Sequence, residues 1–180
     1  MPRVLVITGF RCSGKETARK YLIQKDAYQD GIDVSDDILR PVADERGITE
    51  ITGLLPLYME LGTDYFFDKI KQKADSVQGK IVVSSVRQLA LYEQLKRRYG
   101  DELALLYLSA HGPARFQRRQ ARRRHGDIEN YEDFIAFERK EMLFYKMAAL
   151  FGNANLAIEN NRTKEDLFRV LDSNIKIGKL

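Results

Sequence analysis

Residues 3–15, RVLVITGFRCSGK, join two patterns that together indicate a fold. Arg3 to Thr8 is a nearly continuous run of aliphatic and β-branched residues, which is typical of a parallel strand buried on both faces. Residues 9–15 match the pattern G-x-x-x-x-G-K. Because this pattern lies between an expected strand and a helix that starts at Lys15, it predicts a phosphate-binding P-loop.

The chemistry of such a loop follows from its backbone. Glycines let the chain curl so that successive N–H groups point at one anion, and the following helix adds the positive end of its dipole. The lysine supplies a charge that can follow the β- and γ-phosphates. The expected phosphate-binding residues are Gly9, Arg11, Cys12, Ser13, Gly14, Lys15, Glu16 and Thr17. The structural alternative is a tight turn with a chance lysine, in which Cys12 is a small loop residue.

The rest of the chain alternates between short apolar runs and amphipathic segments. Strands are expected at residues 3–8, 31–34, 80–84, 103–109 and 156–159, and helices at 15–25, 36–46, 54–73, 88–98, 113–124, 131–150 and 164–173. This alternation predicts an α/β fold with a five-stranded parallel sheet flanked by helices. It continues without a break, so we expect one domain over residues 1–180.

Composition narrows the class of protein. The 180 residues are 44% hydrophobic and 31% charged, an ordinary balance for a globular chain. One cysteine excludes an internal disulfide and favours a reducing, cytoplasmic setting. No apolar run approaches the roughly 18 residues of a membrane helix, so no membrane partner is expected. Nothing in the composition sets the oligomeric state.

Positive charge is concentrated in one segment. Residues 103–126 contain six arginines and no acid, whereas the net charge of the whole chain is only +4. Arg115, Arg118 and Arg122 are three or four residues apart, so a helix would bring them together, and guanidinium groups suit phosphate oxygens. We therefore expect an arginine-rich lid over about residues 111–130. The alternative is a solvated basic helix, with Arg123 and Arg124 as plain surface residues.

Two positions depart from the usual metal site of P-loop proteins. Glu16 stands where a serine or threonine would bind Mg²⁺, and Thr17 follows it. Glu16 is a candidate metal ligand, or only an acid favoured in the first turn of a helix. Ser84 ends the third strand, where an aspartate usually holds the metal.

Several strings extend a resemblance beyond the P-loop. They are DDILR at 36–40, SSVR at 84–87, the arginines at 115, 118 and 122, the pair Tyr131 and Phe134, and Glu138-Arg139. Over residues 3–172 the chain resembles dephospho-CoA kinase-like and adenylate-kinase-related proteins, notably an archaeal group. The resemblance implies a nucleotide-kinase fold, ATP as donor with Mg²⁺, and a nucleotide or nucleotide-like acceptor. It matches Arg87 to an arginine that follows a strand in that group.

These residues give a functional hypothesis with named roles. Lys15, Arg87, Arg118, Arg122 and Asp37 are expected to be catalytic, and Arg115 to bind the nucleotide. Arg87 and Arg40 are candidates for the acceptor's phosphate or for surface ion pairs. Asp36 or Asp37 would act as base or merely cap a helix, within an acceptor region at about 36–75.

Two other classes of function compete with a kinase. One is a nucleotide-binding protein with little turnover, suggested by Glu16 and Ser84. The other is nucleic-acid binding through residues 115–124. The sequence argues against the second, because the basic segment covers only about three helical turns.

Overall fold

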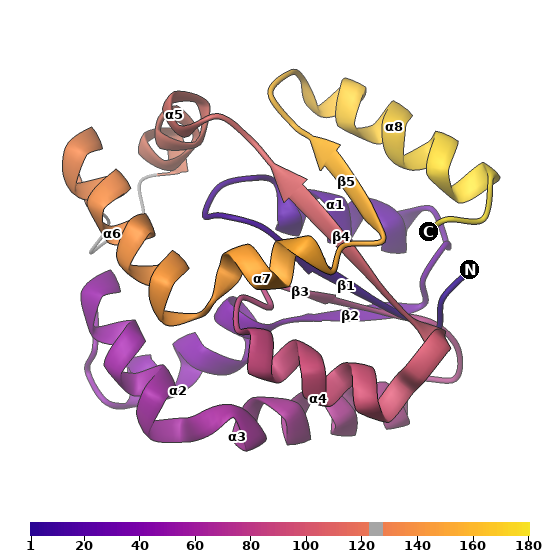
Figure 1. Cartoon of the computed structure of the whole chain (residues 1–180), viewed down its shortest axis with the longest axis horizontal. Coiled ribbons are helices and arrows are strands. Elements are labelled where there is room, and N and C mark those ends of the chain that lie inside the picture. The colour runs from indigo at the N-terminus through magenta and orange to yellow at the C-terminus, as the bar shows by residue number, and fades with distance from the viewer. Residues whose placement is uncertain (123–127) are drawn as a thin grey trace.

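Five parallel strands form the central sheet of the computed structural model, which describes residues 1–122 and 128–180 (Figure 1). The strand order is β2-β3-β1-β4-β5, and every pair is parallel. The strands are β1 (Val4–Thr8), β2 (Asp30–Asp33), β3 (Ile81–Ser84), β4 (Leu103–Ser109) and β5 (Leu156–Glu159). The predicted α/β fold with a five-stranded parallel sheet is confirmed.

Strand β1 lies in the middle of the sheet. Val4 is in register with Ile81 of β3 and with Leu103 of β4, and all five residues of β1 are buried. This explains the unbroken aliphatic run in the sequence, since both faces of a central strand are covered. Because the strands are parallel, their carboxyl ends meet at one edge of the sheet, where the loop after β1 lies.

Helices cover the two faces of the sheet and surround that edge. Val4 and Val6 of β1 belong to the core on the side of α3 (Leu54–Ser76), α4 (Leu89–Tyr99) and α7 (Met147–Gly152). Leu5 and Ile7 belong to the opposite core, with α1 (Lys15–Gln24) and α8 (Lys164–Lys176). The other helices, α2 (Arg40–Glu45), α5 (Gly112–Arg122) and α6 (Tyr131–Phe144), lie towards the carboxyl ends of the strands (Figure 1).

The helix expected at residues 36–46 starts differently. A π-helical segment, Val34–Leu39, precedes α2. Its N-cap is Asp33, whose side chain accepts hydrogen bonds from the backbone N–H groups of Ser35 and Asp36. The prediction that Asp36 or Asp37 caps this helix was therefore wrong, because the last residue of β2 already satisfies the free N–H groups.

Two long predicted helices are interrupted. Gly62 has φ 75° and ψ 163° inside α3, a conformation that glycine adopts without a steric penalty. The helix expected over residues 131–150 divides into α6 and α7, because Lys146 adopts a left-handed conformation. The Tyr145 carbonyl before it accepts a hydrogen bond from the Leu89 N–H at 3.2 Å.

The predicted lid is described only in part. Helix α5 confirms the expected basic helix as far as Arg122. Arg123, Arg124, His125 and Gly126 lie outside the described residues. Within residues 1–122 and 128–180, no helix has the length and apolar character needed to cross a membrane.

Candidate functional site

The loop between β1 and α1 has a backbone that requires its two glycines. Gly9 and Gly14 have φ of 143° and 102°, values that side chains disfavour. A Cβ at Gly9 would lie 2.1 Å from the Leu108 carbonyl oxygen, and one at Gly14 would lie 2.3 Å from Nδ2 of Asn160. The curled path therefore depends on the absence of side chains, as in an anion-binding loop.

Lys15 folds back over this loop. Its Nζ donates hydrogen bonds to the carbonyl oxygens of Gly9 at 3.0 Å and Phe10 at 2.7 Å, and the residue is only 5% exposed. Burial, and next the positive charge of Arg87, lower the pKa of Lys15 from 10.5 to about 7. A phosphate group in the loop would favour the charged amine again, because an opposite charge stabilises it.

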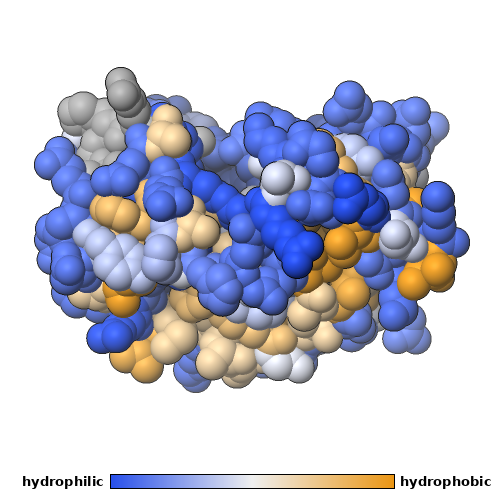
Figure 2. All heavy atoms as spheres, turned by 90° about the horizontal axis from the view of Figure 1, so that it is seen from above, coloured by the Kyte–Doolittle hydropathy of each residue, from blue (hydrophilic) through white to orange (hydrophobic). Residues whose placement is uncertain are grey.

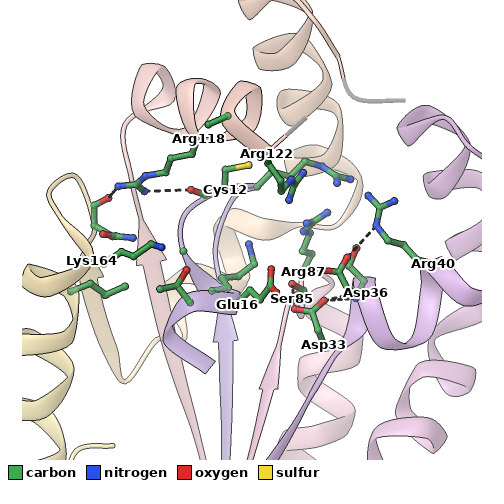
Figure 3. Close-up of a pocket in the computed structure, with 18 of the residues that line it drawn as sticks. Cys12, Glu16, Asp33, Asp36, Arg40, Ser85, Arg87, Arg118, Arg122 and Lys164 are labelled. Carbon is green, nitrogen blue, oxygen red and sulfur yellow. Dashed lines mark hydrogen bonds and ion pairs between the residues drawn. The ribbon is translucent and has the colours of Figure 1, made fainter. Parts of the chain in front are cut away.

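A cavity of about 520 Å³ opens beside the loop at the carboxyl ends of the strands (Figure 3), where open α/β sheets bind ligands. Eight cationic residues line it: Arg11, Lys15, Arg40, Arg87, Arg118, Arg122, Arg162 and Lys164. Three acids line it as well: Glu16, Asp33 and Asp36. Seen from above, hydrophilic residues cover the upper part of the molecule, and more apolar residues lie along the lower middle and the right of the view (Figure 2). The excess of positive charge suits a polyphosphate.

The predicted loop residues divide into two groups. Cys12, Gly14, Lys15, Glu16 and Thr17 line the cavity, as expected for a phosphate site. Arg11 also lines it, but its guanidinium donates two hydrogen bonds to Glu141, at 2.6 and 2.9 Å. Arg11 is therefore held to the protein rather than extended into the cavity.

The acceptor side of the cavity is built around Asp33. Its Oδ2 accepts hydrogen bonds from the hydroxyl groups of Ser84 at 2.6 Å and Ser85 at 2.8 Å. Asp33 is 2% exposed and lines the cavity together with Asp36, which pairs with Arg40 at 3.1 Å. Asp37 does not line it: one of its oxygens accepts the Asp33 N–H and lies 3.7 Å from Arg19. Of the two predicted acids, Asp36 therefore lines the cavity and Asp37 does not, and Asp33 is a further candidate base that the sequence did not indicate.

The residues at the two metal positions have different surroundings. Glu16 lines the cavity but also forms an ion pair with Lys20 at 2.6 Å, and its side chain is 41% exposed. Thr17 and Asp33 supply a hydroxyl and a carboxylate to the cavity. Among the described residues, no three histidine, cysteine or acidic residues cluster as a metal site. This donor set fits Mg²⁺, which keeps several waters and takes other ligands from the phosphates.

The arginines of α5 have separate roles. Arg118 and Arg122 line the cavity, and Arg118 donates to the carbonyl oxygens of Asn160 at 2.8 Å and Cys12 at 3.4 Å. Arg115 is 5% exposed, pairs with Glu138, and donates to the Ala110 carbonyl at 2.8 Å. Arg119 is 2% exposed and lies over the Phe134 ring. The solvated-helix interpretation fails for this part of α5, and Arg115 supports the loop rather than facing the cavity.

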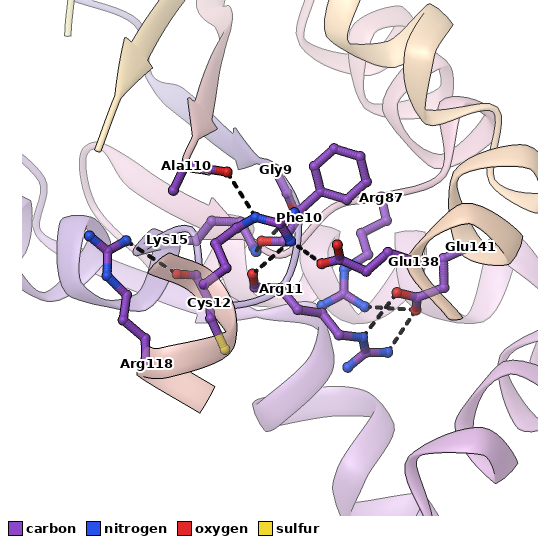
Figure 4. A network of polar contacts seen from close by, with 11 residues as sticks. Gly9, Phe10, Arg11, Cys12, Lys15, Arg87, Ala110, Arg118, Glu138 and Glu141 are labelled. Carbon is purple, nitrogen blue, oxygen red and sulfur yellow. Dashed lines mark hydrogen bonds and ion pairs between the residues drawn. The ribbon is translucent and has the colours of Figure 1, made fainter. Parts of the chain in front are cut away.

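Two glutamates of α6 hold this arrangement, and sequence reasoning missed them as site residues. Glu138 and Glu141 are each 3% exposed. Glu138 binds Arg115, while Glu141 binds both Arg11 and Arg87, the latter at 3.1 Å (Figure 4). Their positions in the sequence could have indicated burial, because both glutamates lie on the same face of the helix as Phe134 and Tyr145. An acid on such a face needs a cationic partner.

Asn160 is a further residue that the sequence did not indicate. It follows β5, is 7% exposed, and donates from Nδ2 to the Ser13 carbonyl at 2.8 Å. Its own N–H donates to the Ser109 carbonyl at 2.8 Å. Asn160 therefore ties the phosphate-binding loop to the ends of β4 and β5.

Comparison with solved structures identifies the fold. A gluconokinase from Sinorhizobium meliloti superposes with a TM-score of 0.65 at 13% identity, over 98% of this chain and 93% of that one. A shikimate kinase from Bacteroides thetaiotaomicron gives a TM-score of 0.65 at 17% identity, over 98% and 99%. The chain has the fold of the P-loop kinases. At these identities the likeness concerns the fold, so the finer resemblance to dephospho-CoA kinases stays a prediction.

Sequence relatives are archaeal proteins without an assigned activity in their names. A UPF0200/UPF0201 protein of Archaeoglobus fulgidus is 25% identical over 177 residues, and a UPF0200 protein of Staphylothermus marinus is 32% identical over 108. This chain matches only 52% and 56% of their lengths. A UPF0200 protein of Methanosarcina barkeri is 28% identical over 186 residues, covering 97% of both chains. No family model matches the chain.

Proposed function

We propose that the protein transfers the γ-phosphoryl group of ATP to a small acceptor. The observation that carries this proposal is the loop itself, with Lys15 buried across it and a cationic cavity in front of it. Phosphoryl transfer depends mainly on positioning and on cations around the transferred group. Lys15, Arg118 and Arg122 would surround the phosphates, with α5 as a lid over them.

The acceptor would lie between Arg87, Arg40 and Asp33. Both arginines line the cavity on the side of β2 and β3 (Figure 3), and they would bind an anionic group of the acceptor. Asp33, at the end of β2, would orient or deprotonate the accepting hydroxyl. We infer a nucleotide or nucleotide-like acceptor from the sequence resemblance. The structural neighbours named above, a gluconokinase and a shikimate kinase, add hydroxy acids as a second acceptor class.

Mg²⁺ would enter with ATP and neutralise charge that develops on the phosphates. Thr17 would hold it, and Asp33 would contact it only through its waters. Asp33 lies beside Ser84 on the neighbouring strand, so a carboxylate is present although β3 does not provide one. This relationship favours turnover over a purely nucleotide-binding role.

The test is product formation by purified protein with ATP and Mg²⁺. The acceptor panel comprises nucleoside monophosphates, dephospho-CoA, gluconate and shikimate, with Lys15→Ala as the control. A phosphorylated product that disappears in the control is the expected result. No product above the Lys15→Ala background for any acceptor would count against a kinase.

A nucleotide-binding protein with little turnover is the second candidate, because Glu16 and Ser84 replace the usual metal-binding residues and Glu16 forms an ion pair with Lys20. Calorimetry with ATP in Mg²⁺ and in EDTA separates the two. Equal affinity in both conditions, without product, would favour this second function.

A further inference from the structure

A second and much smaller cavity adjoins the acceptor side of the main one. It shares four lining residues with the main cavity: Arg11, Ser35, Ser85 and Arg87. Its remaining walls are apolar or aromatic: Val34, Leu39, Leu54, Tyr58 and Tyr145. Its volume is about 20 Å³, and a single water needs roughly 10–15 Å³. The small cavity therefore has room for one oxygen atom and none for a ring.

Two residues that line this cavity each have a buried polar atom without a hydrogen-bond partner. The two atoms are Oη of Tyr58 and Nε of Arg87. Tyr58 is 5% exposed and its ring is fixed by stacking on Phe66 at 4.0 Å between centroids, while Arg87 is fixed through Glu141 at 3.1 Å. Buried donors without partners are rare in folded proteins, so each calls for an explanation. An oxygen in the small cavity would supply the missing acceptor to both.

The charges around the cavity favour an anion there. Arg11 and Arg87 bring two positive charges, and Glu141 balances only one of them. Asp33 lines the main cavity but not the small one. A largely buried excess of positive charge is stabilised by a negatively charged partner that forms good hydrogen bonds. A neutral water would leave this charge uncompensated.

We propose that the small cavity binds one oxygen of the acceptor's anionic group, a carboxylate or a phosphate, held jointly by Tyr58 Oη and Arg87 Nε. This inference rests on the proposed function, since it assigns part of the acceptor site. It adds Tyr58 to that site as a binding residue. It also requires the acceptor to place its anionic group here and its reacting oxygen towards Asp33, so no nucleobase occupies this cavity.

The test compares Tyr58→Phe with a matched control, Tyr99→Phe. Tyr99 is also 5% exposed and also has a hydroxyl without a partner, but it precedes β4 at the opposite edge of the sheet. Binding of AMP, for phosphate, and of gluconate, for carboxylate, is measured by calorimetry. Each titration is run with and without a non-hydrolysable ATP analogue and Mg²⁺.

We expect at least one probe to bind the wild-type protein and to lose about tenfold or more in affinity in Tyr58→Phe, the size expected for a hydrogen bond to a charged group. Tyr99→Phe should bind as the wild type does. The probe that shows the loss identifies the source of the anion. If both probes bound Tyr58→Phe as tightly as the wild type, the inference would be overturned, and the occupant of the small cavity would be a water.

Two further measurements keep the result interpretable. Both phenylalanine variants remove a buried hydroxyl without a partner, so neither should lower the thermal unfolding midpoint. Arg87→Lys keeps the charge but removes the Nε–H and should cause a similar loss of probe affinity. Failure of the ATP analogue to bind would count against the proposed function, while the probe titrations without it still decide on the small cavity.

Discussion

The Ser84 hydroxyl donates a hydrogen bond to the Asp33 carboxylate at 2.6 Å, across the paired ends of β3 and β2. Ser84 occupies the position where the sequence lacks the expected metal-site aspartate, and Asp33 brings a carboxylate to the same place from the neighbouring strand. The site therefore has an acid at the strand ends, supplied by a different strand from the one that the pattern indicated.

Asp33→Asn is expected to lower turnover by roughly 10²-fold or more, as for the loss of a general base. The asparagine oxygen can still accept the N–H groups of Ser35 and Asp36, so the local fold should persist. Steady-state kinetics with the identified acceptor measures the effect. Asp30→Asn is the matched control, because Asp30 starts the same strand and binds Lys73 outside the cavity. Equal turnover in both variants would remove Asp33 from the mechanism.

Lys15→Met is expected to stabilise the protein without nucleotide. The pKa of Lys15 falls from 10.5 to about 7 on folding, so the folded state disfavours the charged amine. The resulting penalty is complete below pH 7 and fades as the pH rises towards 10.5. Each pKa unit between the folded and unfolded states corresponds to about 1.4 kcal/mol of free energy. The variant removes this penalty but also loses the two hydrogen bonds to carbonyl groups. We therefore expect its free energy of unfolding at pH 6.5 to be higher than that of the wild type by about 1–3 kcal/mol.

Urea unfolding of wild type and Lys15→Met at pH 6.5 and pH 9.5 measures this gain. The difference between the two proteins should narrow at the higher pH, since the wild-type amine is then neutral in the folded state. A variant that is less stable than the wild type at both values would show that Lys15 is not destabilised in the free protein.

The sequence predicted the sheet well because its signals are local. Burial of two strands could be inferred from their own residues. They are the aliphatic run of β1 and the run LALLYLS of β4, Leu103–Ser109. Helix interruptions were less visible. Gly62 and Lys146 break two helices through backbone conformation, and only Gly62 carries a local sign of it.

The candidate site was predicted most completely where one short segment builds it, although Arg87, Arg118 and Arg122 from other segments also line the cavity as expected. The P-loop is contiguous, so its pattern places Lys15 and Thr17 together. Arg115 and Glu138, by contrast, are separated by 23 positions and meet only in the fold. The spacing of the arginines predicted that Arg115 binds the nucleotide, whereas its pairing with Glu138 makes it a support for the loop. A pattern in a single sequence does not indicate such a partner.

Nucleotide binding is expected to take up protons at Lys15. Without ligand the pKa of Lys15 is about 7, and a triphosphate in the loop raises it because the charged amine gains an opposite charge. At pH 8 binding should therefore take up close to one proton, and at pH 6 much less. Above pH 7 the affinity should fall by up to tenfold per pH unit.

Calorimetry with the ATP analogue at pH 8 in HEPES and in Tris measures this uptake. The apparent binding enthalpy differs between the buffers by the number of protons exchanged multiplied by the difference between their ionisation enthalpies. The same titration of Lys15→Met is the control for protons taken up elsewhere. Identical apparent enthalpies in the two buffers for the wild type would place the titrating amine outside the phosphate site.

Arg115→Met is expected to destabilise the fold rather than to alter acceptor binding. Removing the arginine leaves Glu138 buried at 3% exposure without its partner, and breaking such a pair costs about 3–5 kcal/mol. The double variant Arg115→Met with Glu138→Leu should recover most of that stability, since two apolar side chains need no partner. Urea unfolding of the single and double variants measures both values. If the double variant were no more stable than Arg115→Met, the pair would not be the reason for the loss, and the hydrogen bond of Arg115 to the Ala110 carbonyl would account for it.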